Sequence, residues 1–188
     1  ATAWVQRFPD AYVFAPQAPR NENTLKSIIV EPHETVDGDP FTALLSSNFR
    51  SFRRPACRDR GDWTRQYLHK VCQIIRKMIE DKKVDPNRVY VTGLSMGGAG
   101  TIRALCVDRT LFTAALPVCP MTSEDTFNEL KSVGKSKIWI ATSYLDNLFE
   151  RNKYLLDGVM ALQDEGSRNA HITIYSRQEI QSYNIGME

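Results

Sequence analysis

The sequence predicts an α/β fold, with a mainly parallel sheet flanked by helices, on three observations. Short runs rich in β-branched and aromatic residues alternate with segments of helical periodicity along most of the chain. A glycine-rich pentapeptide, residues 93–97, stands directly between one such run and one such segment. The 188 residues are 42% hydrophobic and 24% charged, a composition that suits a single globular domain over residues 1–188.

Apolar spacing and turn residues place the individual elements. We expect strands over residues 11–15, 27–30, 89–92, 112–119, 138–142 and 171–175. We expect helices over residues 63–79, 97–107 and 150–165, and a further one that begins at Thr122. Asp125 is placed for a capping contact in that last helix, and Gly166 is a helix stop signal. The connection over residues 17–62 has little periodicity, which is typical of a functional loop or a lid.

Composition argues against several classes of function. The formal net charge of +2 gives no reason to expect nucleic acid or a membrane as a partner, and no apolar run approaches the length of a membrane span. The four cysteines form no CxxC pair and have no metal-ligand spacing with the three histidines, so we expect no metal and no cofactor. Buried thiols are the favoured interpretation of the cysteines, but a disulfide stays open, and so does the cellular compartment.

The pentapeptide is a Gly-x-Ser-x-Gly motif in strand–turn–helix context. This motif predicts Ser95 as a nucleophile that a sharp, strained turn holds out of the sheet. Gly93 and Gly97 make room for that bend, and Gly98 extends the small surface. The turn also puts the N–H of Met96 at a helix N-terminus, where it can donate to a developing oxyanion. The alternative is a purely structural glycine-rich turn.

The motif narrows the fold to the α/β-hydrolase type, in which an acid and then a histidine follow the serine along the chain. Asp146 comes four residues after Thr142 closes the strand expected over residues 138–142. We therefore predict that Asp146 orients the histidine. Its structural alternative is an Asx-turn or the N-cap of the following helix, and Glu150 is a local rival for the acid role.

No histidine stands where the base is expected, in the loop after Tyr175. His171 is at the start of its strand, at the end opposite the active face, His69 is on the polar side of its helix, and His33 is in the long loop. Each is better explained as a surface or structural residue. We therefore expect residues 1–188 to be a partial domain that lacks both the N-terminal strands with their oxyanion loop and the C-terminal histidine loop.

Several segments resemble the esterase family related to polyhydroxybutyrate depolymerases and feruloyl esterases. Residues 8–19, FPDAYVFAPQAP, are similar to that family's Pro-x-x-Val-x-x-Pro-Gln-x-Pro segment. Residues 85–98, DPNRVYVTGLSMGG, are similar to its nucleophile turn, and residues 116–119 to its next strand end. The resemblance implies Ser95 as nucleophile, Asp146 as acid and the Met96 N–H as half of the oxyanion hole. It also slightly favours a secreted protein.

The leading hypothesis is a serine carboxylic-ester hydrolase that forms an acyl-enzyme on Ser95. Its expected substrates are small-molecule or polysaccharide esters. A serine peptidase of the same fold, or a catalytically inactive binding protein of this fold, are the alternatives. For substrate binding we single out Gln17, in the Pro-Gln-x-Pro segment, and Trp63, which either forms an aromatic wall for an acyl or aryl group or packs at a helix start.

Overall fold

A computed structural model describes residues 10–18, 63–123, 125–146 and 151–182. The chain divides into two compact units, one made of Ala1–Phe14 and Thr64–Glu188 and the other of Ala15–Trp63. The helices and strands described below all belong to the first unit. The expectation of one domain over residues 1–188 stays a prediction, and the strand expected over residues 27–30 lies outside the described residues.

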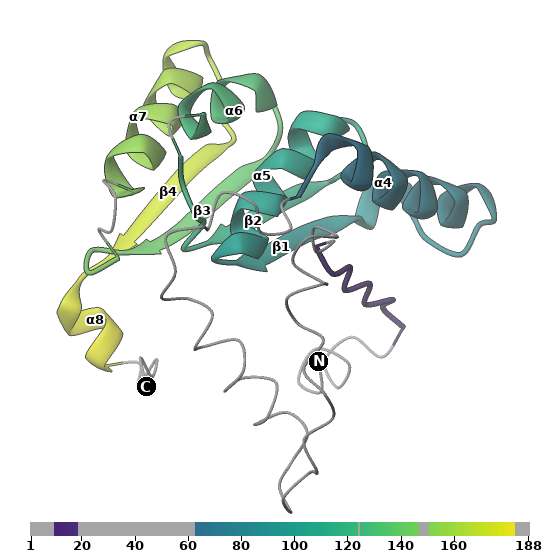
Figure 1. The fold of residues 1–188 in the computed structure, drawn as a ribbon, viewed down its shortest axis with the longest axis horizontal. Helices are drawn as coiled ribbons and strands as arrows, with labels where there is room; N and C mark the ends of the chain where they lie inside the picture. Colours follow the sequence, from purple (N-terminus) through teal and green to yellow (C-terminus); the bar gives the residue numbers. More distant parts are fainter. Residues whose placement is uncertain (1–9, 19–62, 124, 147–150, 183–188) are drawn as a thin grey trace, which may run out of the picture. The chain divides into compact units, whose positions relative to one another are not determined.

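Four strands form one parallel sheet in the order β1-β2-β3-β4 (Figure 1). The strands are β1 (Tyr90–Leu94), β2 (Ala114–Val118), β3 (Ile138–Ser143) and β4 (Ala170–Tyr175). Because sequential strands lie next to one another and run the same way, each connection has to cross back over the sheet, and a helix lies in each of these connections. The fold class predicted from the alternating pattern is confirmed.

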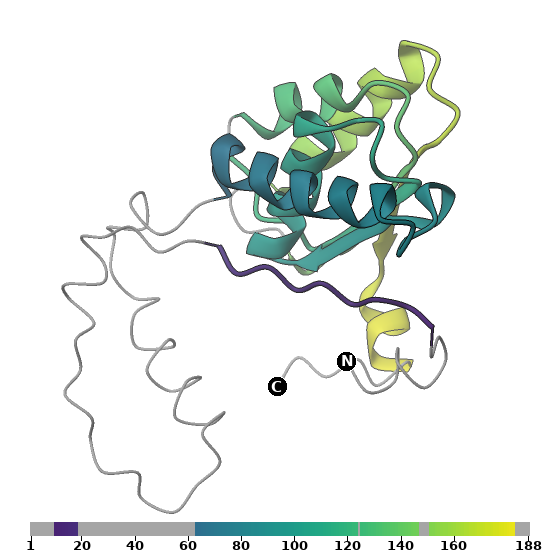
Figure 2. The same ribbon diagram turned by 90° about the vertical axis from the view of Figure 1, so that its right-hand side faces the viewer.

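The helices α4 to α7 lie together on one face of this sheet (Figures 1 and 2). Their bounds are α4 (Arg65–Glu80), α5 (Met96–Val107), α6 (Thr126–Val133) and α7 (Arg151–Asp164), and a short helix α8 (Arg177–Ser182) follows β4. One turn of 3₁₀ helix, η2 (Pro86–Arg88), leads into β1, and the Asp85 carboxylate accepts from the Asn87 N–H there. The predicted helices over residues 63–79, 97–107 and 150–165 are thereby confirmed.

The core lies between these helices and the sheet. It is built from aliphatic side chains that are at most 1% exposed: Ile102, Leu105, Leu130, Val133, Ile138, Ile140, Leu155, Val159 and Leu162. Burying one such side chain stabilises a fold by about 1.5–3 kcal/mol. Along β3 the burial alternates, since Ile138 and Ile140 are buried whereas Trp139 is 55% exposed. This core holds the strands in register and so determines where their ends lie.

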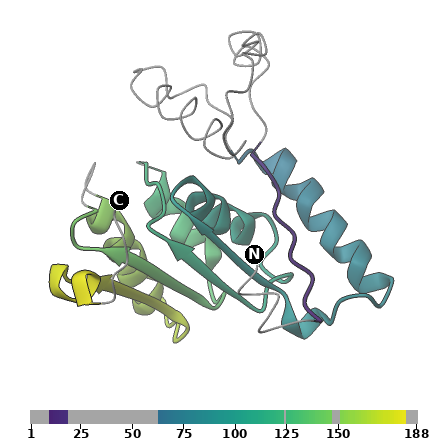
Figure 3. The same ribbon diagram turned by 90° about the horizontal axis from the view of Figure 1, so that it is seen from below.

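The carboxyl ends of all four strands meet at one edge of the sheet, called the carboxyl edge below. Leu94 at the end of β1 pairs with Val118 at the end of β2, and Ser143 at the end of β3 pairs with Tyr175 at the end of β4. Seen from below, the strands follow one another from yellow β4 to teal β1 (Figure 3). Residues that leave β1, β2 and β3 are therefore neighbours in space, as the predicted site requires.

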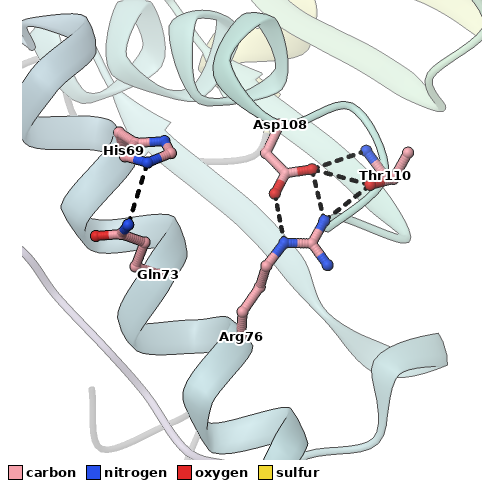
Figure 4. A network of polar contacts seen from close by, with 5 residues as sticks. All are labelled: His69, Gln73, Arg76, Asp108 and Thr110. Atoms are coloured by element: carbon pink, nitrogen blue, oxygen red, sulfur yellow. Dashed lines mark hydrogen bonds and ion pairs between the residues drawn. The ribbon is translucent and has the colours of Figure 1, made fainter.

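A polar network joins α4 to the connection after α5 (Figure 4). The Arg76 guanidinium donates to both Asp108 carboxylate oxygens, at 2.7 and 2.8 Å, and to the Thr110 hydroxyl at 2.8 Å. The Arg76 guanidinium holds the pKa of Asp108 below its ordinary value of 3.8. On the same helix, a His69 ring nitrogen lies 3.2 Å from the Gln73 amide nitrogen, in an exposed position.

One expected strand is wrong, and one expected helix begins later than predicted. Residues 11–15 form no strand, and Tyr12, Val13 and Phe14 are 65, 59 and 48% exposed. Their β-propensity had no effect because strand formation needs a neighbouring strand, and none of the described strands pairs with them. The helix expected to begin at Thr122 does form, but α6 begins four residues later, at Thr126.

The reason for the later start of α6 is a local turn. The Thr126 hydroxyl accepts from the Ser123 N–H at 2.8 Å, and the Thr126 N–H donates to the Ser123 carbonyl at 3.0 Å. Asp125 is the N-cap residue, but its side chain makes no capping hydrogen bond. Gly166, with φ +87°, ends the segment after α7 as predicted, because a left-handed conformation favours glycine.

Candidate active site

Ser95 occupies a strained turn between β1 and α5, called the nucleophile turn here (residues 93–98). Its φ and ψ are +56° and −112°, a conformation that residues with side chains rarely adopt. Ser95 is the N-cap residue of α5, yet its hydroxyl makes no capping hydrogen bond. Serine at an N-cap usually caps the helix. Here the strained backbone leaves the hydroxyl to other partners, as the predicted nucleophile requires.

Two glycines make this turn possible. A Cβ at Gly93 would lie 2.3 Å from the Gly97 carbonyl oxygen, and a Cβ at Gly98 would lie 2.7 Å from the Pro120 Cα. Both contacts are with backbone atoms that cannot move aside cheaply. A Cβ at Gly97 would meet nothing within 4 Å, so the expectation that Gly97 supplies room by lacking a side chain is wrong. The role of Gly97 in the turn comes from its backbone, because the chain at Gly93 passes close to the Gly97 carbonyl.

Backbone hydrogen bonds with residues at and after the end of β2, and one from α5, hold the nucleophile turn. The Ser95 N–H donates to the Val118 carbonyl at 2.9 Å, and the Ser95 carbonyl accepts from Met121 at 2.9 Å and from Ala99 at 3.1 Å. Met96 is the first residue of α5, so its N–H belongs to the first helical turn, which has no intrahelical acceptor. The N–H of Met96 thus lies at a helix N-terminus next to Ser95, where an oxyanion donor is expected.

Asp146 lies in a tight turn after β3, called the acid turn here (residues 143–146). Its N–H donates to the Ser143 carbonyl at 3.0 Å, and the Ser143 hydroxyl accepts from the Leu145 N–H at 3.0 Å. The Asn152 side chain, on α7, donates to the same Ser143 carbonyl at 3.1 Å and accepts from the Thr142 hydroxyl at 3.1 Å. Asp146 is half-buried, and the rival Glu150 lies outside the described residues.

The nucleophile and acid turns leave strands that are separated by β2 alone. Neighbouring strands are about 4.8 Å apart, so the two turns start about 10 Å from each other. A gap of this order fits an imidazole ring that hydrogen-bonds a serine on one side and a carboxylate on the other. The placement of Ser95 and Asp146 on the carboxyl edge is therefore compatible with the roles predicted for them.

Cys119 occupies the same edge between the two turns, which the sequence analysis did not anticipate. It follows β2 directly, its N–H donates to the Ala141 carbonyl at 2.8 Å, and its φ is +40°. Burial raises the pKa of the Cys119 thiol, and the neighbouring Asp146 carboxylate raises this pKa further. The available signal was its place at the end of the strand expected over residues 112–119, beside the strand of the serine.

The other described cysteines support the buried-thiol interpretation in part. Cys72 is 2% exposed, and burial raises the pKa of its thiol to about 11. Cys106 is half-buried, donates to the Glu129 carbonyl at 3.2 Å and accepts from Ser132 at 3.0 Å. Cys72, Cys106 and Cys119 are all free thiols, and Cys57 lies outside the described residues.

Neither described histidine is placed to act on Ser95. His171 is the second residue of β4, about 13 Å from the carboxyl edge at 3.3 Å per residue, and its ring packs against Trp139 in a T-shaped arrangement. His69 is exposed on α4 beside Gln73. His33 lies outside the described residues.

The two predicted substrate-binding residues belong to the second unit. Gln17 is exposed, whereas Trp63 is only 9% exposed and directly precedes Thr64, the N-cap of α4. A role in substrate binding stays a prediction for both residues.

The carboxyl edge also carries a cavity near the acid turn. This cavity has a volume of about 420 Å³ and is lined by Tyr144, Ile174, Ser176, Arg177 and Gln178. In the described part of the chain, no cluster of three or more His, Cys, Asp or Glu side chains could hold a metal ion. None of the described helices has the length and apolar character needed to cross a membrane.

Comparison with known proteins identifies relatives of this chain. The model of the prolyl oligopeptidase family matches residues 52–162. A crystal structure of a thermostable esterase is 29% identical, with a TM-score of 0.52, over 63% of this chain and 30% of that one. The crystal structure of Arabidopsis thaliana SOBER1 is 17% identical, with a TM-score of 0.44, over 64% of this chain and 60% of that one. The chain thus spans less than two thirds of either protein, and no curated protein matches it.

Proposed function

Because this chain belongs to the prolyl oligopeptidase family and has the α/β-hydrolase fold, we propose that it acts as a serine hydrolase that cleaves carboxylic esters. Ser95 is the nucleophile of this proposal, Asp146 orients the base, and the Met96 N–H is one oxyanion donor. A relationship to the esterases of the polyhydroxybutyrate depolymerase and feruloyl esterase type is part of the proposal. Small-molecule or polysaccharide esters are the substrates that it implies.

The conformation of Ser95 is the observation that carries this proposal. A strained φ of +56° costs folding free energy, on the order of 1–3 kcal/mol. The surrounding glycines and three backbone hydrogen bonds maintain it. Strain of this kind persists where a function requires the side chain to project from the sheet. A structural glycine-rich turn, the alternative, would not need the strain at the serine.

The proposed reaction has two steps. A histidine other than His69 and His171 removes the proton from the Ser95 hydroxyl, while the serine oxygen attacks the ester carbonyl carbon. The carbonyl oxygen takes up the negative charge and accepts from the Met96 N–H, and the alcohol then leaves with the proton that the histidine held. Water, activated by the same histidine, hydrolyses the acyl-enzyme and releases the acid. Asp146 holds the imidazole in the orientation and tautomer that both steps need.

The choice of ester over amide rests on two supports. Of the two solved structures compared above, the thermostable esterase has the higher sequence identity to this chain. The motifs of residues 8–19 and 85–98 also resemble esterase motifs. The name of the family model favours the second candidate, a peptidase, because the same groups cleave amides. The rates at which the full-length protein hydrolyses a nitrophenyl ester and a peptide nitroanilide distinguish the esterase from the peptidase. Faster turnover of the amide would replace the ester proposal with the peptidase.

A fluorophosphonate probe tests the nucleophile directly. We expect the full-length protein to form a covalent adduct on Ser95. Ser95→Ala should abolish this adduct and lower the turnover by at least about 10⁴-fold. The matched control is Ser136→Ala, which removes a hydroxyl that donates to the Val133 carbonyl at the end of α6, so labelling should persist. An unlabelled Ser95 in folded full-length protein would leave the inactive binding protein as the better description.

A further inference from the structure

We propose that Asn152 is a positioning residue, whose side-chain amide holds the acid turn in the place from which Asp146 orients the base. This inference rests on the proposed function, since the place of the turn matters for turnover only if Asp146 acts on a base. It adds a residue of α7 to a site that the sequence assigned to the ends of β1 and β3.

The start of the acid turn lies beyond the end of β2. Ala141 pairs with Val118, the last residue of β2, and the Ala141 carbonyl accepts from the Cys119 N–H at 2.8 Å. Ser143 stands two residues further along β3 and pairs only with Tyr175 of β4 in the described sheet. A strand end with one neighbouring strand needs other partners for its remaining backbone groups. The Ser143 carbonyl takes its partners from the turn and from α7.

Two donors meet at the Ser143 carbonyl. The Asp146 N–H donates to it at 3.0 Å, and the Asn152 side-chain nitrogen donates to it at 3.1 Å. A carbonyl oxygen has two lone pairs, so both hydrogen bonds can form together. The bond that closes the acid turn and the bond that ties the turn to α7 therefore share one acceptor. A shift of Ser143 away from Asn152 would move the start of the turn, and with it the backbone of Asp146.

The Asn152 amide has one orientation that suits both of its partners. Its oxygen accepts from the Thr142 hydroxyl at 3.1 Å, and Thr142 is 2% exposed. Its nitrogen faces the Ser143 carbonyl, which can only accept. The opposite orientation would place the amide oxygen against that carbonyl oxygen, with no hydrogen between them. The buried Thr142 hydroxyl thus helps to orient the amide that holds the turn.

The helix that carries Asn152 is anchored in the core. Leu155 and Val159, which follow on α7, are 0 and 1% exposed. At Gly158 the helix lies so close to α6 that a Cβ would be 2.5 Å from the Leu130 side chain. A group that positions another works best when its own element is held by packing. Asn152 therefore ties the acid turn to the packed core.

A second amide on the same helix offers a matched control. The Gln163 side chain donates to the Ala170 carbonyl at 2.9 Å. Gln163 thus ties α7 to the sheet through a backbone carbonyl, as Asn152 does. Ala170 is the first residue of β4, however, so this bond lies at the edge of the sheet opposite the acid turn. Gln163→Ala removes the same kind of hydrogen bond and leaves the acid turn untouched.

The first experiment tests the contact without relying on catalysis. Amide hydrogen exchange at the Asp146 N–H is measured by NMR in the full-length protein. Asn152→Ala should speed this exchange by about fivefold, because the loss of one hydrogen bond favours local opening of the turn. Gln163→Ala should leave the exchange at Asp146 unchanged. Exchange at the wild-type rate in Asn152→Ala would overturn the proposal.

The second experiment tests the effect on turnover. Asn152→Ala should lower kcat by about tenfold with little change in KM, since one orienting hydrogen bond is lost. The acidic limb of kcat/KM against pH should also move to lower pH, because a displaced Asp146 carboxylate raises the pKa of the imidazole less. Gln163→Ala should keep the wild-type kcat and the wild-type pH profile. Equal kcat values and profiles for the two variants would contradict the positioning role.

Thr142→Val is the milder variant, and it keeps the inference testable if Asn152→Ala does not fold. It retains the shape of the side chain but removes the hydroxyl that orients the Asn152 amide. We expect kcat to fall by about threefold, with the acidic limb again moved to lower pH. A folded Thr142→Val with the wild-type kcat and pH profile would count against the role of the amide.

The experiments separate failure of this inference from failure of the proposed function. If the fluorophosphonate probe does not label Ser95, the enzyme proposal fails, whereas the exchange rates still report the contact between Asn152 and the acid turn. If the probe labels Ser95 and Asn152→Ala keeps the wild-type kcat and pH profile, the positioning role alone is refuted. A lower kcat with an unmoved acidic limb also refutes it, because a general loss of stability would then explain the change.

Discussion

The nucleophile turn and the acid turn lie on the same edge of one sheet, but different interactions hold them. The nucleophile turn is forced by sterics within its own short sequence, where Gly93 and Gly98 allow backbone contacts that a Cβ would prevent. The acid turn is held by hydrogen bonds that involve the side chains of Ser143 and Asn152. The nucleophile turn thus depends on its own backbone, whereas the acid turn depends on partners from other elements.

The difference explains why the two turns respond differently to substitution. A steric requirement fails completely when one atom is added, because backbone atoms at 2.3 Å cannot be accommodated by a rotamer change. A set of hydrogen bonds fails gradually, since each bond contributes about 1 kcal/mol net. The predictions below use this contrast and run from the largest expected effect to the smallest.

Gly93→Ala should have the largest effect on stability. The new Cβ would meet the Gly97 backbone, so we expect the free energy of unfolding to fall by more than about 3 kcal/mol, measured by urea denaturation. Gly97→Ala is the matched control from the same motif. Its Cβ meets nothing within 4 Å in a helical position, so this variant should be neutral or up to about 1 kcal/mol more stable. Equal losses for both glycines would contradict the steric account.

Asn152→Ala should destabilise the acid turn by an intermediate amount. It removes the donor to the Ser143 carbonyl and leaves the Thr142 hydroxyl, which is 2% exposed, without the Asn152 acceptor. We expect a loss of about 1–3 kcal/mol in the free energy of unfolding, together with slower probe labelling of Ser95. The neighbouring control is Lys153→Ala, which removes an exposed ion pair with Asp157 and should cost at most about 0.5 kcal/mol.

Asp108→Asn should have a smaller, pH-dependent effect and should leave both turns intact. Arg76 lowers the pKa of Asp108 in the folded protein, so the pair stabilises the fold above the ordinary value of 3.8 and loses that contribution as pH falls through the lowered pKa. With Arg76 46% exposed and Asp108 18% exposed, we expect about 1 kcal/mol at pH 7. Thermal unfolding at pH 7 and below pH 3 measures this difference, which should shrink at the lower pH, while Ser95 labelling stays normal.

The strands and helices that carry the site were largely predictable. The apolar spacing of residues 63–79 and 150–165 and the strand-forming runs before Ser95 and Asp146 are local signals, and each of these elements forms within two residues of its expected bounds. Residues 11–15 have a strand-forming pattern of the same quality but form no strand. The pattern shows that a segment is able to form a strand, but the strand exists only where another strand is its neighbour.

By itself, the sequence determined the α/β fold, the turn at Ser95 and the position of Asp146 after its strand, because all three follow from local spacing and from the small residues that a tight turn needs. Only the tertiary structure decided which glycines are indispensable, that Cys119 at the end of β2 is hydrogen-bonded to β3, and that His171 lies at the opposite end of the sheet. These facts depend on the register between strands, which is set by the packed core. No single segment carries that information, because register is a relation between segments distant in the chain.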